Sequence, residues 1–108
     1  MERRHYPRIP VSLEISFDNG EEVLSSYLFD LGEGGLFIGT PHPLEEGTRI
    51  RLLFKLPDWG NPVNIIGTVV WRQGKEDTSR PGMGVRFDEM GSEDREILNA
   101  YVMEQLRN

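Results

Sequence analysis

The stretch from Val11 to Gly20 reads VSLEISFDNG and decides the fold class of this chain of 108 residues. Its first seven residues alternate strictly between apolar and polar side chains, which is the period-two pattern of a β-strand with one buried and one wet face. The Asp-Asn-Gly that follows tolerates a positive φ at both central turn positions, so it predicts a tight hairpin into a second strand. The stretch therefore predicts an antiparallel β-protein.

Five further segments have strand character and are separated by turns rich in glycine and proline. They cover residues 23–29, 36–39, 49–56, 63–72 and 83–87. Gly67 lies inside the longest of them and predicts a β-bulge or a sharply coiled barrel strand, and Trp71 in the same run is expected in the core. Six short strands favour a sandwich or a barrel, and closure into a barrel removes the exposed edges that promote aggregation.

The period changes at Ser92, which offers an N-cap ahead of an acidic first turn. Apolar residues then recur at intervals of three and four and form one stripe, made of Ile97, Leu98, Tyr101, Val102 and Leu106. The prediction is a helix at about 92–107 that buries this stripe on the sheet. The fold class is thus all-β with a terminal amphipathic helix, and the barrel domain is expected to span 11–108.

Composition excludes several classes of protein. The chain has no cysteine, which removes disulfides and thiolate metal sites and fits a cytoplasmic protein. No window is apolar enough to cross a membrane, and the polar N-terminus does not resemble a signal peptide. The net charge of −6 argues against a general nucleic-acid binder. Residues 1–10 nevertheless form a cationic stretch, which we expect to be a flexible arm.

Catalytic and metal sites are not predicted. The two histidines, His5 and His42, have no partner at a metal-binding spacing and no neighbouring nucleophile. Acidic pairs such as Glu21-Glu22 are best explained as solvated surface. We therefore expect no catalytic residue, no metal ligand and no cofactor, and we expect binding instead.

Two short features point to binding. The first is the pair Arg4 and Arg8, whose guanidinium groups can donate to phosphate oxygens or to the edge of guanine. The second runs from Asp30 to Gly35, where a carboxylate could accept from guanine and glycines allow a ligand to approach the backbone. Each feature alone also fits a plainer explanation, a solvated tail for the first and an ordinary β-turn for the second.

Taken together, these features resemble the PilZ domain family of cyclic di-GMP receptors. That family has an Arg-x-x-x-Arg arm, then an Asp/Asn-x-Ser-x-x-Gly turn followed by an apolar strand. Further similar words are PLEEGTRI at 43–50, GTVVW at 67–71 and GMGVRF at 82–87, so the resemblance covers nearly the whole chain. It implies a six-stranded antiparallel β-barrel with a C-terminal helix.

The resemblance also implies a set of ligand-binding residues. Arg4 and Arg8 match the arginines that grip the guanine and phosphates, Arg3 is an adjacent cation, and Asp30 and Gly35 match the ends of the turn motif. Gly32 departs from the family, which has serine there. Losing one hydrogen bond of about 0.5–1.5 kcal/mol predicts a roughly tenfold weaker affinity rather than none.

Two functions remain open at this point. The first is a cyclic di-GMP effector that signals through contacts with a protein partner, in motility or surface behaviour. The alternative is a degenerate module that no longer binds nucleotide and acts only through protein contacts. Trp59 fits that alternative as an exposed interface anchor, and it fits equally well as a loop residue tucked onto the barrel end. General RNA binding is disfavoured by the acidic body.

Overall fold

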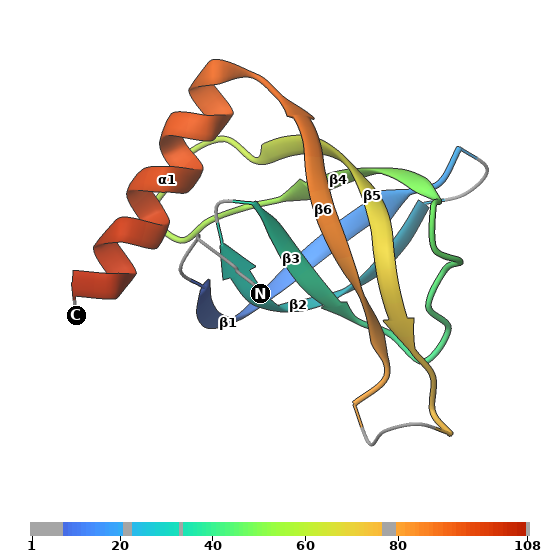
Figure 1. Cartoon of the computed structure of the whole chain (residues 1–108). Coiled ribbons are helices and arrows are strands. Elements are labelled where there is room, and N and C mark those ends of the chain that lie inside the picture. Colours follow the sequence, from blue (N-terminus) through green and yellow to red (C-terminus); the bar gives the residue numbers. More distant parts are fainter. Residues whose placement is uncertain (1–7, 21–22, 33, 77–79, 108) are drawn as a thin grey trace, which may run out of the picture.

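The computed structural model describes residues 8–20, 23–32, 34–76 and 80–107, except for the side chains of Arg8 and Phe29. It contains six strands and one helix (Figure 1). The elements are β1 (Arg8–Asp18), β2 (Val23–Gly32), β3 (Gly35–Gly39), β4 (Arg49–Phe54), β5 (Val63–Gln73), β6 (Gly82–Met90) and α1 (Ser92–Arg107).

The strands form a closed antiparallel barrel in the order β1-β2-β3-β6-β5-β4. The predicted fold class is therefore confirmed. Alternating residues of each strand point inward, as Ile50, Leu52 and Phe54 of β4 do, each at most 3% exposed. This follows from the pleat, because successive side chains of a strand point to opposite faces of the sheet.

Both strands of the first hairpin are longer than the sequence indicated, β1 at its start and β2 at its end. β1 begins at Arg8, so residues 8–10 belong to the sheet and not to the arm. β2 continues to Gly32, inside the segment that was expected to turn. The flexibility of the arm stays a prediction, since residues 1–7 lie outside the described residues.

β5 carries two irregularities in its pairing with β6. The first lies at the predicted position, between Ile66 and Gly67, but its extra residue is Asp88, so the bulged strand is β6 and not β5. The second lies between Val69 and Trp71, so one extra residue reverses the alternation beyond it. Trp71 therefore faces outward and is 43% exposed, and its assignment to the core was wrong.

α1 lies beside one end of the barrel and contacts β1 and β5 (Figure 1). The N–H of Arg95 donates to the carbonyl of Gly91 at 3.0 Å, which makes Gly91 the N-cap and places Ser92 inside the first turn. The predicted stripe is buried at Leu98, Tyr101 and Val102, with Ile97 packed against it, whereas Leu106 is 45% exposed. The helix thus runs past the edge of the barrel at its last turn.

Trp59 lies in the connection between β4 and β5 and packs, partly buried, against the core cluster. The backbone N–H of Trp59 donates to the carbonyl of Leu56 at 3.2 Å, and this hydrogen bond fixes the turn that carries the side chain. Of its two interpretations, the residue tucked onto the barrel end is therefore the one that the packing supports.

Candidate ligand-binding face

The pairing of β1 with β2 brings the two predicted binding features together. Arg8 lies directly opposite Gly32, and Pro10 lies opposite Asp30. Residues paired in this way have Cα atoms about 4.5–5.5 Å apart. The start of β1 and the end of β2 are therefore neighbours, although they are more than twenty positions apart in the sequence.

Asp30 begins a row of paired residues that crosses the outside of the barrel. Asp30 pairs with Phe37 of β3, Phe37 pairs with Gly84 of β6, and Gly84 pairs with Trp71 of β5. We call the outer surface of β2, β3, β6 and β5 around this row the motif face. A carboxylate, half-buried at one end, and an exposed indole at the other thus lie on one surface.

An aromatic pair covers the middle of the motif face. The rings of Phe37 and Trp71 are stacked, with centroids 5.4 Å apart and planes 22° from parallel. A Cβ on Gly84 would lie 2.1 Å from Nε1 of Trp71, and one on Gly82 would lie 2.4 Å from the ring of Phe37. The two glycines of β6 therefore make room for the two rings, and the indole of Trp71 stays partly exposed on this face.

Gly35 is required by the fold. A Cβ there would lie 2.5 Å from the carbonyl oxygen of Val85, closer than real side chains come to backbone. The adjacent Gly34 accepts a hydrogen bond of 2.9 Å from the N–H of Phe87. The close approach expected at Gly35 is thus made by β6, and any ligand meets a backbone that is already fixed in place.

A cluster of charged residues borders the motif face. Arg86 lies opposite Gly35, and its Nε donates to Oδ1 of Asp88 at 2.9 Å. The hydroxyl of Thr68 donates to Oδ2 of the same carboxylate at 2.5 Å. The hydrogen bond from Thr68, helped by the charge of Arg86, holds the pKa of Asp88 below its ordinary value, although burial acts in the opposite direction.

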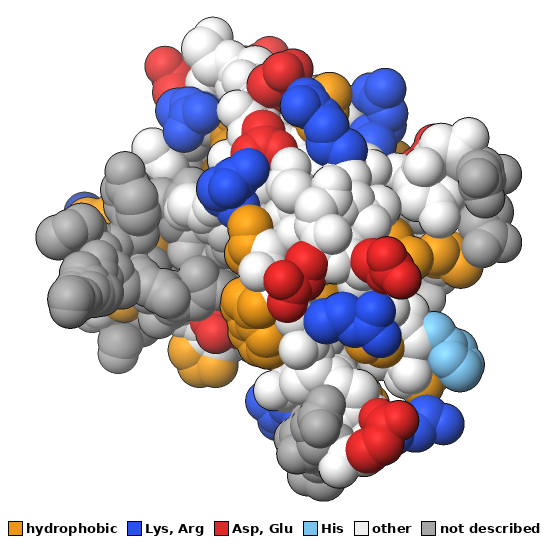
Figure 2. Space-filling view, turned by 45° about the vertical axis from the view of Figure 1, so that its right-hand side comes forward, with side chains coloured by type: hydrophobic (Ala, Val, Ile, Leu, Met, Phe, Trp, Pro, Cys, Tyr) orange, Lys and Arg blue, Asp and Glu red, His pale blue; other side chains and the backbone are white. Residues whose placement is uncertain are grey.

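The guanidinium of Arg86 stays accessible in this arrangement, since its side chain is 60% exposed while that of Asp88 is only 17% exposed. Arg49 forms a separate ion pair with Glu89 at 3.1 Å. On the side shown in Figure 2, basic and acidic side chains are interspersed. By strand pairing, Arg86 lies opposite one end of the turn motif, at Gly35, just as the backbone of Arg8 lies opposite Gly32.

The predicted site residues fall into two groups. Asp30, Gly32 and Gly35 lie on adjacent strands of the described barrel, and the backbone of Arg8 lies beside them. Arg3 and Arg4 lie outside the described residues.

Sequence reasoning missed Trp71 and Arg86 as candidate site residues. The alternating glycines of GMGVRF were a usable signal for Trp71, because two glycines on one face of a strand leave room for large side chains from its neighbours.

Other kinds of site find no support in the described residues. No group of three or more His, Asp or Glu side chains among them could hold a metal ion. No helix in that same part of the chain is long and apolar enough to cross a membrane.

The described barrel thus combines a terminal helix with a β1 strand that is paired to the Asp30-to-Gly32 end of β2. The model of the PilZ domain family matches residues 2–104. The chain belongs to the PilZ domain family. No curated protein sequence matches it significantly.

Solved structures share this fold. The inhibitor of motility MotI/DgrA of Bacillus subtilis superposes with a TM-score of 0.84 at 19% identity, over 100% of this chain and 54% of that one. The PilZ domain of Escherichia coli YcgR with c-di-GMP superposes with a TM-score of 0.78 at 21% identity, over 98% of this chain and 93% of that one. The PilZ domain of CeSA from a cellulose-synthesizing bacterium superposes with a TM-score of 0.62 at 16% identity, over 94% of this chain and 99% of that one. The chain thus spans about half the length of MotI/DgrA.

Proposed function

We propose that this chain is a bacterial, cytoplasmic cyclic di-GMP receptor that signals through contact with a protein partner, in the control of motility. The observation that carries the proposal is the pairing of Arg8 with Gly32 and of Pro10 with Asp30. It unites the two halves of the family's ligand motif on one surface. The similarity to a YcgR domain named with c-di-GMP and to an inhibitor of motility supports the choice of ligand and process.

The proposed binding mode assigns a task to each part of the motif face. Arg4 and Arg8 donate to the phosphates and the guanine edge, with Arg3 as a further cation. Asp30 accepts from the N1–H and N2–H₂ groups of one guanine. The exposed ring of Trp71 offers a stacking surface for a base, which is worth about 1–3 kcal/mol in comparable contacts. Arg86 adds positive charge at the border. No group for covalent chemistry is assigned, and we expect no turnover of the dinucleotide.

Isothermal titration with cyclic di-GMP at moderate salt tests this proposal. We expect an affinity in the micromolar range or tighter, and a loss of about ten- to a hundredfold on Arg8→Ala, because a hydrogen bond to a charged group contributes roughly 1.5–3 kcal/mol. Arg51→Ala, an exposed arginine on β4, is the matched control and should leave the affinity unchanged. Absence of heat at millimolar ligand would remove the proposal.

One observation favours the second candidate, a module that has lost the nucleotide. Gly32 stands where the family has serine, and it lies buried in β2 opposite Arg8. Gly32→Ser should tighten cyclic di-GMP binding about tenfold if the hydroxyl is the missing contact. If neither the chain nor this variant binds, the domain acts through protein contacts alone.

A further inference from the structure

β1 has a neighbouring strand on both sides along only part of its length. It pairs with β2 between Arg8 and Asp18, with a register shift between Pro10 and Leu13, but it pairs with β4 only from Ile15 to Asp18. On the β4 side, the main chain of residues 11–14 has no partner strand among the described residues. Unpaired N–H and C=O groups along a strand edge are a template for pairing with another extended chain.

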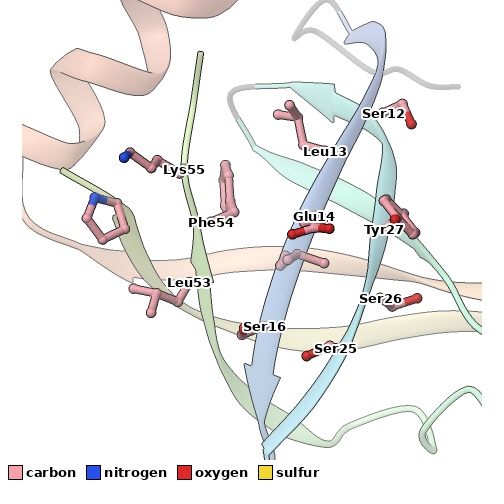
Figure 3. A pocket seen from close by; sticks show the side chains of 12 residues that line it. Ser12, Leu13, Glu14, Ser16, Ser25, Ser26, Tyr27, Leu53, Phe54 and Lys55 are labelled. Atoms are coloured by element: carbon pink, nitrogen blue, oxygen red, sulfur yellow. The ribbon is translucent and has the colours of Figure 1, made fainter. Parts of the chain in front are cut away.

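A hollow of about 750 Å³ lies where β1 and β4 separate (Figure 3). Serines line it together with apolar side chains, among them Leu13 and Phe54. We call this hollow the seam groove, and its principal residues are Ser12, Glu14, Ser16, Ser25, Tyr27, Leu53 and Lys55. The groove and the motif face share β2, but the groove is lined by its residues 25–27 together with β1 and β4, whereas the motif face begins at Asp30 and continues over β3, β6 and β5.

Two opposite charges flank the seam groove without meeting. One further step of the β1–β4 pairing beyond Ile15 and Phe54 would place Glu14 opposite Lys55. The pairing stops before that step, and neither side chain has a hydrogen bond or ion pair with any residue that the structure describes. Figure 3 shows Glu14 on β1 and Lys55 on the β4 side of the separation, with the Lys55 side chain directed away from β1. An occupant that carries one basic and one acidic residue would satisfy both.

The rim of the groove also offers apolar contact. Tyr27 is 48% exposed on β2, and Leu53 is 41% exposed on β4. Leu53 lies on the β4 side of β1, where a chain that enters between β1 and β4 can place a side chain against it, whereas Tyr27 lies beyond β1. Main-chain pairing would provide affinity, and the alternate side-chain positions would provide selectivity.

We propose that the seam groove binds an extended segment of a partner protein, which adds as a strand to the free edge of residues 11–14. The segment spans about five residues, or roughly 17 Å in strand conformation. It is free of proline, apolar or β-branched at alternate positions, and carries a cation for Glu14 and an anion for Lys55. This surface gives the domain a contact with protein whether or not nucleotide binds, so the inference does not rest on the proposed function.

Selection from a display library of random nine-residue peptides, without nucleotide, tests the proposal. The bait is the full chain, and the matched bait is the double variant Glu14→Lys with Lys55→Glu. Sequences of the stated chemistry should be enriched on the full chain. In NMR titrations the synthetic peptides should shift the amide signals of residues 11–16 and of Leu53 to Lys55. Glu14→Lys should weaken binding about two- to fivefold, since an exposed ion pair is worth little.

Three controls make the outcome decisive. A peptide with its charges exchanged should regain affinity for the double variant, and Glu104→Lys, on the exposed side of α1, should change nothing. Methylating the backbone nitrogens of the bound peptide should abolish binding, because the added strand would lose its donors. Four results would each overturn the proposal: no enrichment above background, equal binding to the double variant, equal binding of the methylated peptide, or signal shifts confined to other strands.

Discussion

The motif face and the seam groove both contain small residues within strands, but for opposite reasons. On the motif face, the space beside each glycine is filled, by the carbonyl of Val85 at Gly35 and by the indole of Trp71 at Gly84. In the seam groove, Ser12, Ser16 and Ser25 border a hollow that no described side chain fills. A small residue in a strand can thus mean close packing in one place and an open surface in another. Only the register of the neighbouring strand shows which of these two cases applies.

The largest effect is expected at Gly35, where the space beside the glycine is filled by backbone. Gly35→Ala places a methyl group against backbone that cannot move without disturbing the β3–β6 pairing. We expect the free energy of unfolding to fall by about 2–3 kcal/mol, in the range of overpacked cores. Urea denaturation measures this loss. An unchanged midpoint would mean that the space beside Gly35 is open, as it is in the groove.

Trp71→Ala uncovers Gly84 and removes the stacking on Phe37. The expected loss of stability is about 1–1.5 kcal/mol, because the indole is partly exposed and an aromatic pair contributes roughly 0.5–1.5 kcal/mol beyond its buried area. Urea denaturation again gives the value. Trp71→Phe is the matched control and should recover most of the loss. If both variants are equally destabilised, the stacking of Trp71 on Phe37 does not account for the stability lost in Trp71→Ala.

Thr68→Val tests the charged border of the motif face. Without the hydroxyl, the pKa of Asp88 should rise toward its ordinary value, and about 0.5–1.5 kcal/mol of stability should be lost at neutral pH. Since the folded pKa is lowered, Asp88 stabilises the fold above its ordinary pKa, and this contribution disappears as the pH falls through the folded pKa. The variant should therefore lose less stability on acidification. NMR titration of the Asp88 carboxyl carbon and unfolding at several pH values measure both effects.

The smallest effect is expected in the groove. Ser25→Val adds volume at an exposed strand position opposite Ser16, where nothing has to move. Stability should change by less than about 0.5 kcal/mol, the usual range for surface substitutions. Thermal unfolding of Ser25→Val and of Gly35→Ala measures how much stability each surface loses on gaining a larger side chain. A loss comparable with that of Gly35→Ala would show that the groove is packed.

Much of the fold could be predicted from the sequence because alternation and turn chemistry are local. The hairpin after Phe17, the irregular pairing beside Gly67 and the terminal helix all followed from patterns within about ten residues. Trp71 was misassigned because a bulge at Val70 reverses the alternation, and no residue type marks that bulge. Ser92 was taken as the N-cap since serine favours that position, but the first helical bond ends at Gly91.

The candidate site was predictable only in part. Asp30 and Gly35 were found through the resemblance to a family, and their proximity to Arg8 depends on a long-range register that local patterns do not encode. Arg86 and Trp71 reach the motif face through β6 and β5, which are far away in the sequence. The role of Gly35 was also more structural than expected, because its contact is with the carbonyl of Val85.

The central claim is that cyclic di-GMP binds on the motif face, and the two tryptophans provide an internal comparison for testing it. Trp71 lies on that face, whereas Trp59 packs against the core beyond the other end of β5. The most direct measurement follows the two indole N–H signals by NMR during titration with the dinucleotide. The account predicts a progressive, saturable shift of the Trp71 signal with the Trp59 signal almost unchanged. A Trp71 signal that stays in place at millimolar ligand, or a shift of Trp59 alone, would contradict it.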